Sequence, residues 1–218
     1  MNLKPQDVCI LLKIVALDGA PWSYSQLAYE LGMSASEVHA GVKRASQACL
    51  LRLQEGWGTP DAAALEEFLV HGLKYAFPPV RGGLTRGIPT SRAAPPLNRA
   101  ALHSAEPPPV WPDEKGEVRG YGFSPLYKSV PFAVRRDARL YELLALVDAI
   151  RSGEGDRDAV IGQLKLRLYT QRKPAKVLSL GRARSSAPAR ARAPAAKARR
   201  GNNGQEGQRV YRRRHRDP

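Results

Sequence analysis

The stretch 23–51 reads SYSQLAYELGMSASEVHAGVKRASQACLL, and it decides how the N-terminal part of the chain is expected to fold. Two Ser-x-x-Gln/Glu patterns begin within it, at Ser23 and at Ser34. In each pattern the serine hydroxyl can accept from a backbone N–H of the first helical turn, while the later Gln or Glu reaches back. Gly32 suits the left-handed residue that ends a helix. The stretch therefore predicts two short helices joined by a tight turn.

Apolar residues recur at helical spacing in both predicted helices, 24–31 and 34–49, and they mark the faces that turn inward. These inward positions are Leu27, Ala28, Leu31, Val38, Val42, Ala45 and Cys49. The opposite face of the second helix is polar and basic, as in a helix that reads the major groove of DNA. The DNA-binding residues expected on it are Ser34, Ser36, His39, Ala40, Lys43, Arg44 and Gln47. An ordinary helical hairpin with a solvated polar face is the alternative.

Within this face, chemistry assigns different roles to different side chains. Ser36 and His39 have the reach and the hydrogen-bonding groups to contact base edges. Lys43 and Arg44 can contact either a base or a phosphate, because cationic side chains serve both purposes. The serine hydroxyl at Ser23, which begins the first helix, is a further candidate phosphate contact.

One string within the stretch resembles a known family. Its residues are Gln26-Leu27-Ala28-x-x-Leu31-Gly32-Met33-Ser34-x-Ser36-x-Val38, continuing to Val42-Lys43-Arg44. It resembles the winged helix-turn-helix regulators of bacteria, most of all the MarR-type group, and the resemblance covers residues 5–77. It implies a winged-helix fold that binds duplex DNA sequence-specifically, with transcriptional repression as the expected role. This chain departs from the family pattern at 54–59, which is too short for a full two-stranded wing.

The surrounding sequence predicts the rest of a DNA-binding domain over 1–77. Proline suits the first turn of a helix, and short apolar runs bounded by Gly and Pro suit strands. In chain order we expect an apolar helix over 5–17, a short strand over 50–53, a turn over 54–60 and a helix over 60–77 capped by Thr59 or Asp61.

Residues 78–109 are rich in Pro, Gly and Arg and have no helical or alternating apolar period, which predicts a solvated linker. The segment 81–87 superficially resembles a phosphate-binding loop, but it lacks the Gly-Lys-Ser/Thr ending, so no nucleotide site is expected. Arg86 and Arg92 are candidate phosphate contacts, because a basic extended arm can accompany a recognition helix.

Residues 110–169 predict a small second region. Two short strands, 110–111 and 117–123, flank a turn and are expected to form a β-hairpin. Asp137 can cap a helix that reaches residue 150, and a second helix over 156–168 would complete an αα-hairpin. Its wide apolar stripe must be covered either by 110–132 or by another chain, so 137–168 is a candidate surface for a homodimer or a protein partner.

Charge is concentrated at the C-terminal end. Of the net charge of +15, residues 170–218 supply +13, with fifteen Lys and Arg against two acidic residues. This Ala/Arg/Pro-rich tail cannot bury enough apolar surface to offset the cost of ordering, so we expect it to be disordered. Clustered arginine favours non-specific phosphate contact with DNA, and RNA fits the tail equally well. A solubilising tail would have the same composition.

Enzyme chemistry is not indicated. The four histidines lie in four different predicted elements, and no GxSxG, HExxH, Walker or CxxC pattern occurs, so we expect no catalytic residue, metal or cofactor. Cys9 and Cys49 fall on predicted inward faces, where two packing thiols are favoured over a redox pair. No leader opens the chain and no apolar run approaches ~18–20 residues, which predicts a soluble cytoplasmic protein with no membrane contact.

Together these features predict a mostly α protein. It would consist of an N-terminal winged helix-turn-helix domain with a truncated wing, the β-hairpin and αα-hairpin region, and a disordered basic tail. Sequence-specific binding of duplex DNA by the helix 34–49 is the favoured function. Two alternatives stay open: a protein-binding antitoxin of a toxin–antitoxin or phage-defence pair that represses its own operon, and an RNA-binding protein that acts through its tail.

Overall fold

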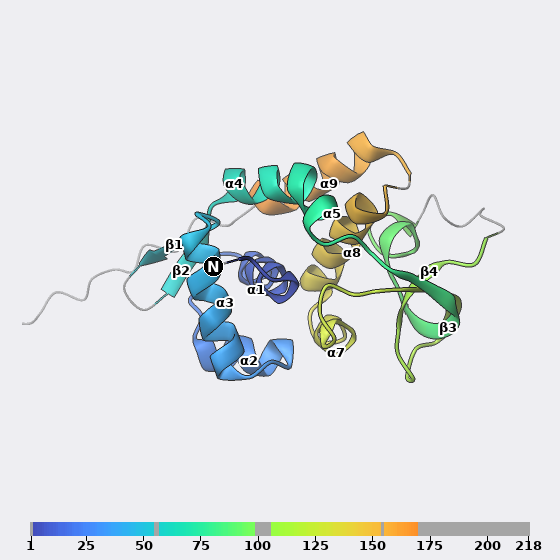
Figure 1. Ribbon diagram of the computed structural model, residues 1–218, viewed down its shortest axis with the longest axis horizontal. Helices are drawn as coiled ribbons and strands as arrows, with labels where there is room; N and C mark the ends of the chain where they lie inside the picture. The colour runs from blue at the N-terminus through green and yellow to red at the C-terminus, as the bar shows by residue number, and fades with distance from the viewer. Residues whose placement is uncertain (1, 55–56, 99–105, 154, 170–218) are drawn as a thin grey trace, which may run out of the picture. The chain divides into compact units, whose positions relative to one another are not determined.

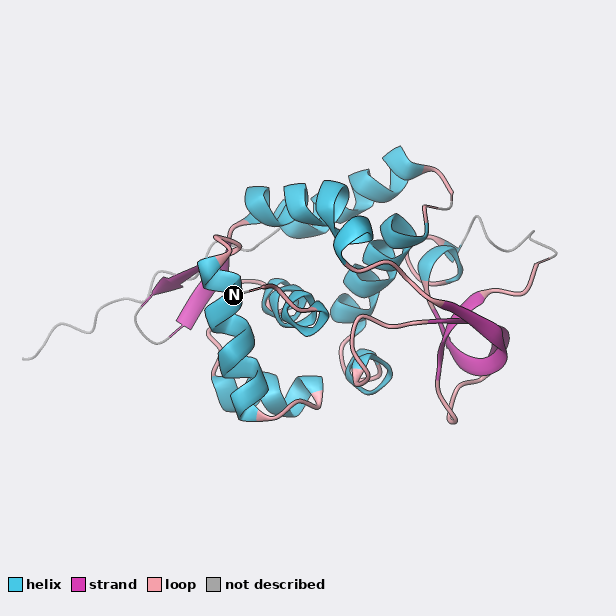
Figure 2. Ribbon diagram, in the orientation of Figure 1, coloured by secondary structure: helices cyan, strands magenta, loops and turns pink. Residues whose placement is uncertain are grey.

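The computed structural model describes residues 2–54, 57–98, 106–153 and 155–169. The fold is mixed α/β, with helices and two small sheets (Figures 1 and 2), where the sequence predicts a mostly α protein. The predicted disordered tail, 170–218, lies outside the described residues.

Helices begin and end the described part of the chain, and the strands lie between them. The helices are α1 Pro5–Ala16, α2 Tyr24–Leu31, α3 Ala35–Gln47, α4 Ala62–Glu67, the π-helical η1 Phe68–Gly72, α5 Leu73–Ala76, the 3-10 helix η2 Ser91–Ala93, α7 Val130–Val134, α8 Ala138–Ser152 and α9 Arg157–Tyr169. The strands are β1 Leu51–Gln54, β2 Trp57–Pro60, β3 Arg81–Pro89, β4 Pro109–Pro112 and β5 Val118–Phe123.

The first three helices form as the capping residues predict. The Ser23 hydroxyl accepts from the backbone N–H of Gln26, and Ser34 forms a complete capping box with Glu37. Gly32 ends α2 in the left-handed conformation, with φ of 62°. The helix α1 packs against both α2 and α3 and is buried on nearly all sides, which explains its continuous apolar sequence.

A two-stranded antiparallel hairpin follows α3. The strands β1 and β2 pair in register from Leu51 opposite Pro60 to Gln54 opposite Trp57. The sequence predicts only the first of these strands, and the assignment of 57–60 to a turn is wrong. The second strand contains glycine and proline, which are uncommon in strands, so its sequence does not indicate a strand. Gly58 fits closely against β1, because a Cβ at this position would lie 3.1 Å from the carbonyl oxygen of Arg52.

The helical run that follows the hairpin contains a change of pitch. Asp61 caps it by accepting from the backbone N–H of Ala64, which confirms one of the two predicted caps. The run then continues from α4 through the π-helical turn η1 into α5. Leu65, Leu69 and Leu73 are fully buried. The predicted helix over 60–77 is therefore present, although it is not one uniform α-helix.

The predicted linker 78–109 is the main error in the sequence interpretation. Its first part is the nine-residue strand β3, which forms a closed three-stranded barrel with β4 and β5. The missing alternation has a physical cause, because close backbone approach requires glycine along these strands. A Cβ at Gly87 would lie 2.0 Å from the carbonyl oxygen of Trp111, and one at Gly120 would lie 1.9 Å from that of Pro108.

The barrel strands also pair differently from the prediction. The strands β4 and β5 lie where expected, but they pair in parallel, with Val110 opposite Gly122, so they do not form a β-hairpin. Each pairs antiparallel with β3, which joins β4 near its end and β5 along most of its length. The turn between them crosses β3, and a Cβ at Gly116 would lie 2.4 Å from the Cα of Gly87.

The barrel begins and ends at one place in the fold. Just before β3, the backbone N–H of Val80 donates to the hydroxyl oxygen of Ser124 at 2.7 Å. Just after β5, the backbone N–H of Ser124 donates to the carbonyl oxygen of Val80 at 3.0 Å. The chain therefore leaves the helices and returns to them through two hydrogen-bonded neighbours.

The predicted αα-hairpin is present as α8 and α9, with Asp137 capping α8. Its apolar stripe is covered within the chain, because α8 packs against α1, α5, α7, α9 and η2. One cluster of buried side chains extends from Val8 in α1 to Leu168 in α9. The predicted boundaries at 77 and 109 therefore do not separate independent cores. Most apolar side chains of the described residues in 137–168 are buried within the chain, while Leu166 is exposed.

A buried polar network joins the barrel to α8. The carboxylate of Asp148 accepts from Thr90 Oγ1 at 2.9 Å, Trp111 Nε1 at 2.7 Å and Arg151 Nη1 at 2.6 Å. The Arg151 guanidinium also donates to the carbonyl oxygens of Phe77 and Ser124. Because buried charges are tolerated only when paired and hydrogen-bonded, these contacts fix how the barrel meets the helices.

Candidate nucleic-acid interface

The outward face of α3 carries most of the side chains expected to contact DNA. Ser36, His39, Lys43 and Gln47 are exposed at helical spacing, and Ala40 between them is half-buried. The opposite face enters the core through Val38, Val42 and Ala45, all at most 1% exposed. Tertiary packing therefore holds α3 in one orientation, and its polar side is directed to solvent.

Arg44 does not belong to this face, and the expectation that it contacts DNA is contradicted. Its side chain is only 7% exposed and forms a two-pronged ion pair with Asp7 of α1. Arg44 Nε lies 2.7 Å from Asp7 Oδ2, and Nη2 lies 2.6 Å from Oδ1. Gly41 makes room for this pair, since a Cβ there would lie 2.4 Å from Ile10 Cδ1 and 2.9 Å from Asp7 Oδ1. Arg44 therefore fastens α3 to α1.

Aromatic packing restrains the histidine on the exposed face. The His39 ring lies 5.0 Å from the Tyr24 ring, centre to centre, and Tyr24 in turn meets Trp22 edge-on at 5.5 Å. Trp22 is buried and its Nε1 donates to the carbonyl oxygen of Gly58 in β2. These contacts link α2, α3 and the β1–β2 hairpin, and they leave His39 with fewer accessible rotamers than a free surface residue.

Residues that follow the barrel hold the turn between α2 and α3. Tyr127 Oη donates to Glu37 Oε1 at 2.5 Å, and Ser129 Oγ donates to the carbonyl oxygen of Leu31 at 2.6 Å. The Phe132 ring packs on Gly32, where a Cβ would lie 2.9 Å from Phe132 Cδ1. We call this contact set the α7 clamp. The sequence does not predict these contacts because 125–132 has no regular period, although its apolar cluster indicates that it packs on another part of the chain.

Ser34 serves the fold within this arrangement. Its hydroxyl donates to Glu37 Oε2 at 2.8 Å and accepts from the Glu37 backbone N–H at 3.2 Å. The Tyr127 hydroxyl, then the Ser34 backbone N–H and hydroxyl, lower the pKa of Glu37 to about 2. Because the hydrogen bonds favour the ionised carboxylate, their stabilising effect is present above the ordinary carboxyl pKa of ~4.3 and is lost as the pH falls towards 2.

The pKa of Glu37 is expected to rise towards its ordinary value in Tyr127→Phe, because this substitution removes the largest of the three causes. Carboxyl titration of Glu37 by NMR measures the midpoint directly. Tyr75→Phe is the control, since Tyr75 is 76% exposed and its ring contacts Lys74. An unchanged Glu37 midpoint in Tyr127→Phe would show that the Tyr127 hydroxyl does not stabilise the ionised Glu37 carboxylate.

The β1–β2 hairpin lies next to α3 in sequence and packs on it through β1. Arg52 and Leu53 project from β1 and are exposed, and Arg52 is ion-paired with Asp61, the cap of α4. The hairpin is short, as its sequence predicts, but both of its strands are formed. An exposed cation and an exposed apolar side chain therefore adjoin the C-terminal end of α3.

The other candidate phosphate contacts lie on separate elements. The Ser23 side chain is exposed, and its hydroxyl caps α2. Arg86 is exposed on β3, and Arg92 on η2 forms an ion pair with Glu106 at 3.2 Å. The helices α1 and α8 lie between α3 and the barrel, because α1 packs on α3 and α8 packs on η2. Arg86 and Arg92 thus belong to a different surface from α3.

The two cysteines lie in different environments. Cys9 is fully buried, and burial raises the pKa of its thiol well above the ordinary range. Cys49 is exposed, so the prediction that both thiols face inward is wrong for Cys49. No group of His, Cys, Asp or Glu side chains in the described ranges is arranged to hold a metal ion. Among the described helices, none is long and apolar enough to cross a membrane.

No family model, curated protein or solved structure matches the chain.

Proposed function

We propose that the protein binds duplex DNA sequence-specifically through α3, as a winged helix-turn-helix regulator does. The observation that carries the proposal is the exposed face of α3, on which Ser36, His39, Lys43 and Gln47 are presented by a helix anchored in the core. A rigidly held helix with short polar side chains near its start is the element that enters the major groove in this class of protein.

Three further features support this proposal. The helix α2 and the Gly32 turn precede α3, as in a helix-turn-helix. The antiparallel β1–β2 hairpin follows α3 at the position of a wing, and Arg52 on it can approach a phosphate. The α7 clamp contacts the turn between α2 and α3 and leaves Ser36 and Lys43 exposed.

Each side chain of the face has a chemical role in this proposal. His39 and Ser36 contact base edges, so their loss relaxes sequence preference by about 1–3 kcal/mol at the contacted position. Lys43 contacts a phosphate, and its loss weakens binding to all sequences alike. Transcriptional repression follows from such binding when the site overlaps a promoter, and this regulatory role is part of the proposal.

The triple variant Ser36→Ala/His39→Ala/Lys43→Ala is expected to lose its preference for a selected duplex over a scrambled one. A duplex is first selected from a random pool with the full-length chain, and its affinity is then measured by fluorescence anisotropy at several salt concentrations. The slope of log K against log salt should become shallower by ~0.9, the contribution of one phosphate contact.

Lys165→Ala is the matched control for the triple variant. Lys165 is exposed on α9, and its substitution removes the same positive charge at a distance from α3. It should keep the duplex preference of the unmodified chain. If the triple variant selects and binds the same duplex as the unmodified chain, then α3 is not the reading element.

A further inference from the structure

A second surface, on the barrel, has the composition of a nucleic-acid-binding site. The strands β3 and β5 place Leu84 opposite Tyr121 and Arg86 opposite Arg119. Positions two apart on a strand share one side of the sheet, so the four side chains form one patch, which we call the barrel face. All four are exposed, with Leu84 at 52% and Tyr121 at 46%.

The Arg86–Arg119 pair is unfavourable in the free protein. Side chains directly opposite on antiparallel strands lie close together, and like charges there are destabilising. Neither arginine has a carboxylate partner in the described part of the chain, whereas the exposed Arg135 is paired with Asp113 at 2.8 Å. An anion that bridges the two guanidinium groups would turn this repulsion into binding energy.

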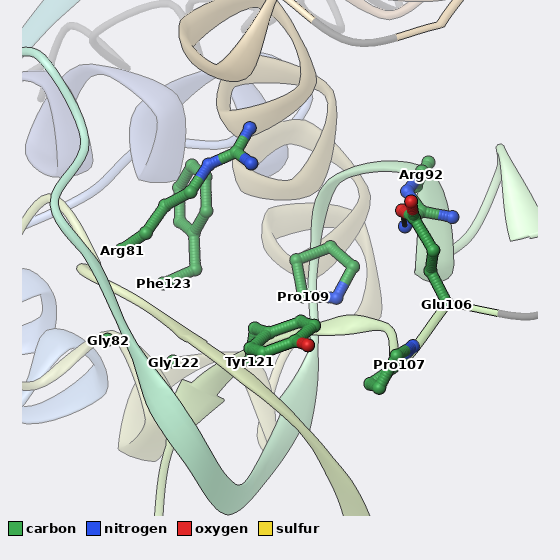
Figure 3. A pocket seen from close by; sticks show the side chains of 9 residues that line it. All are labelled: Arg81, Gly82, Arg92, Glu106, Pro107, Pro109, Tyr121, Gly122 and Phe123. Atoms are coloured by element: carbon green, nitrogen blue, oxygen red, sulfur yellow. Dashed lines mark hydrogen bonds and ion pairs between the residues drawn. The ribbon is translucent and has the colours of Figure 1, made fainter.

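The Tyr121 ring lines a pocket beside the glycines of β3. Gly82 lines this pocket (Figure 3), and a Cβ at Gly83, the next residue of β3, would meet nothing within 4 Å. The pocket has a volume of about 340 Å³. Figure 3 shows Tyr121 and Pro109 in the middle of its lining. Arg81 and Phe123 lie to one side of them, and Arg92 and Glu106 lie to the other. A planar group can therefore approach the ring over Gly82 and Gly83, which carry no side chain.

We infer that the barrel face binds single-stranded nucleic acid, with an unpaired base stacked on Tyr121 and the adjoining phosphates held by Arg86 and Arg119. Stacking on an exposed aromatic ring beside cationic side chains is how single strands are held on small β-barrels without sequence readout. A base-paired duplex does not offer this free face. The inference does not rest on the proposed function, since the barrel face and α3 share no residue.

Binding is tested with the full-length chain and labelled oligothymidine of about twelve nucleotides, within the ~4–16 nucleotides that one such fold covers. The basic segment 170–218 contributes equally in every variant, so differences between variants report on the barrel face. Tyr121→Ala should weaken binding roughly tenfold, the effect of losing one stacked base, and Tyr121→Phe should restore it. A parallel series with oligouridine assigns the preferred strand as DNA or RNA.

The cations are tested separately through salt dependence. Arg86→Gln/Arg119→Gln should make the slope of log K against log salt shallower by ~1.4, because single-strand contacts contribute ~0.7 each. Arg139→Gln/Lys165→Gln removes the same charge from exposed, ion-paired positions on α8 and α9 and should leave the slope unchanged. Equal slopes for the two double variants would overturn the inference.

Two further measurements complete the test. Tyr121→Trp should bind as the unmodified chain does and show fluorescence quenching by the single strand, since a stacked base quenches an indole. The affinity of Tyr121→Ala for the selected duplex should stay within twofold of the unmodified value, which separates this site from α3. Unchanged single-strand affinity in Tyr121→Ala, with its thermal unfolding also unchanged, would overturn the inference.

Discussion

Arg44→Met is expected to lower the free energy of unfolding by about 3–5 kcal/mol, the usual cost of leaving one partner of a buried ion pair without the other. Asp7 is completely buried, and the substitution removes both guanidinium donors from its carboxylate. A domain of this size has ~5–15 kcal/mol in total, so the loss should be evident in chemical denaturation followed by circular dichroism. DNA binding by this variant should fall because α3 is no longer held against α1.

Two comparisons separate a structural role of Arg44 from a DNA contact. Lys43→Met changes the neighbouring exposed residue and should alter stability by no more than about 0.5 kcal/mol. Asp7→Asn/Arg44→Met removes both charges while keeping an oxygen that can accept from the Lys4 backbone N–H. This double variant should recover most of the lost stability. If Arg44→Met is as stable as the unmodified protein and yet fails to bind DNA, Arg44 is a DNA contact after all.

Asp148→Ala is expected to lower the free energy of unfolding by a similar amount, about 3–5 kcal/mol. The Asp148 carboxylate accepts three hydrogen bonds, and its removal leaves the buried Arg151 cation uncompensated and the Trp111 N–H without its acceptor. These donors come from the barrel and from α8, so the damage should centre on the junction between them. Hydrogen exchange should become faster in β3, β4 and β5 before it does in α1.

The control for this variant is Glu114→Ala, which removes an exposed carboxylate from the barrel turn and should change stability by at most about 0.5 kcal/mol. Asp148→Asn should fall between the two, because its amide oxygen still accepts from Trp111 or Thr90. If β3, β4 and β5 exchange at the same rates in Asp148→Ala as in the unmodified chain, the network does not hold the barrel in place.

Local signals in the sequence predict the helices well. The capping serines, the Gly32 turn and the inward Val38–Val42 row describe α2 and α3 because each depends on residues within one helical turn. The αα-hairpin follows from the Asp137 cap and the glycine at 153 for the same reason. These features also correctly separate the exposed side of α3 from its buried side, with the exceptions of Arg44 and of Cys49, which follows α3 and is exposed.

Arg44 shows what periodicity leaves out. It lies next to the exposed Lys43, and charge alone favours solvent for both. Its actual environment depends on Asp7, 37 positions earlier in the chain, and on the space left by Gly41. The signal in the sequence is Asp7, the one carboxylate of the largely apolar helix α1, because a buried charge needs a partner of opposite sign.

The barrel could not be predicted from local pattern. Its strands carry glycine and proline where a sheet usually shows alternation, and β4 and β5 pair in parallel although a short turn connects them. The positions and the pairing of these strands depend on contacts between distant segments, such as Val80 with Ser124. The α7 clamp is likewise not predicted from the sequence around α3, because Tyr127 is 90 positions from Glu37, the residue that it contacts.

The junction at Val80 and Ser124 gives the chain the architecture of an insertion. The helices form one body from two stretches of sequence, and the barrel is added between them at neighbouring attachment points. The second stretch carries the α7 clamp, so the part of the molecule that supports the start of α3 is encoded after the barrel. A ribosome must therefore finish the barrel before α3 has its full set of contacts.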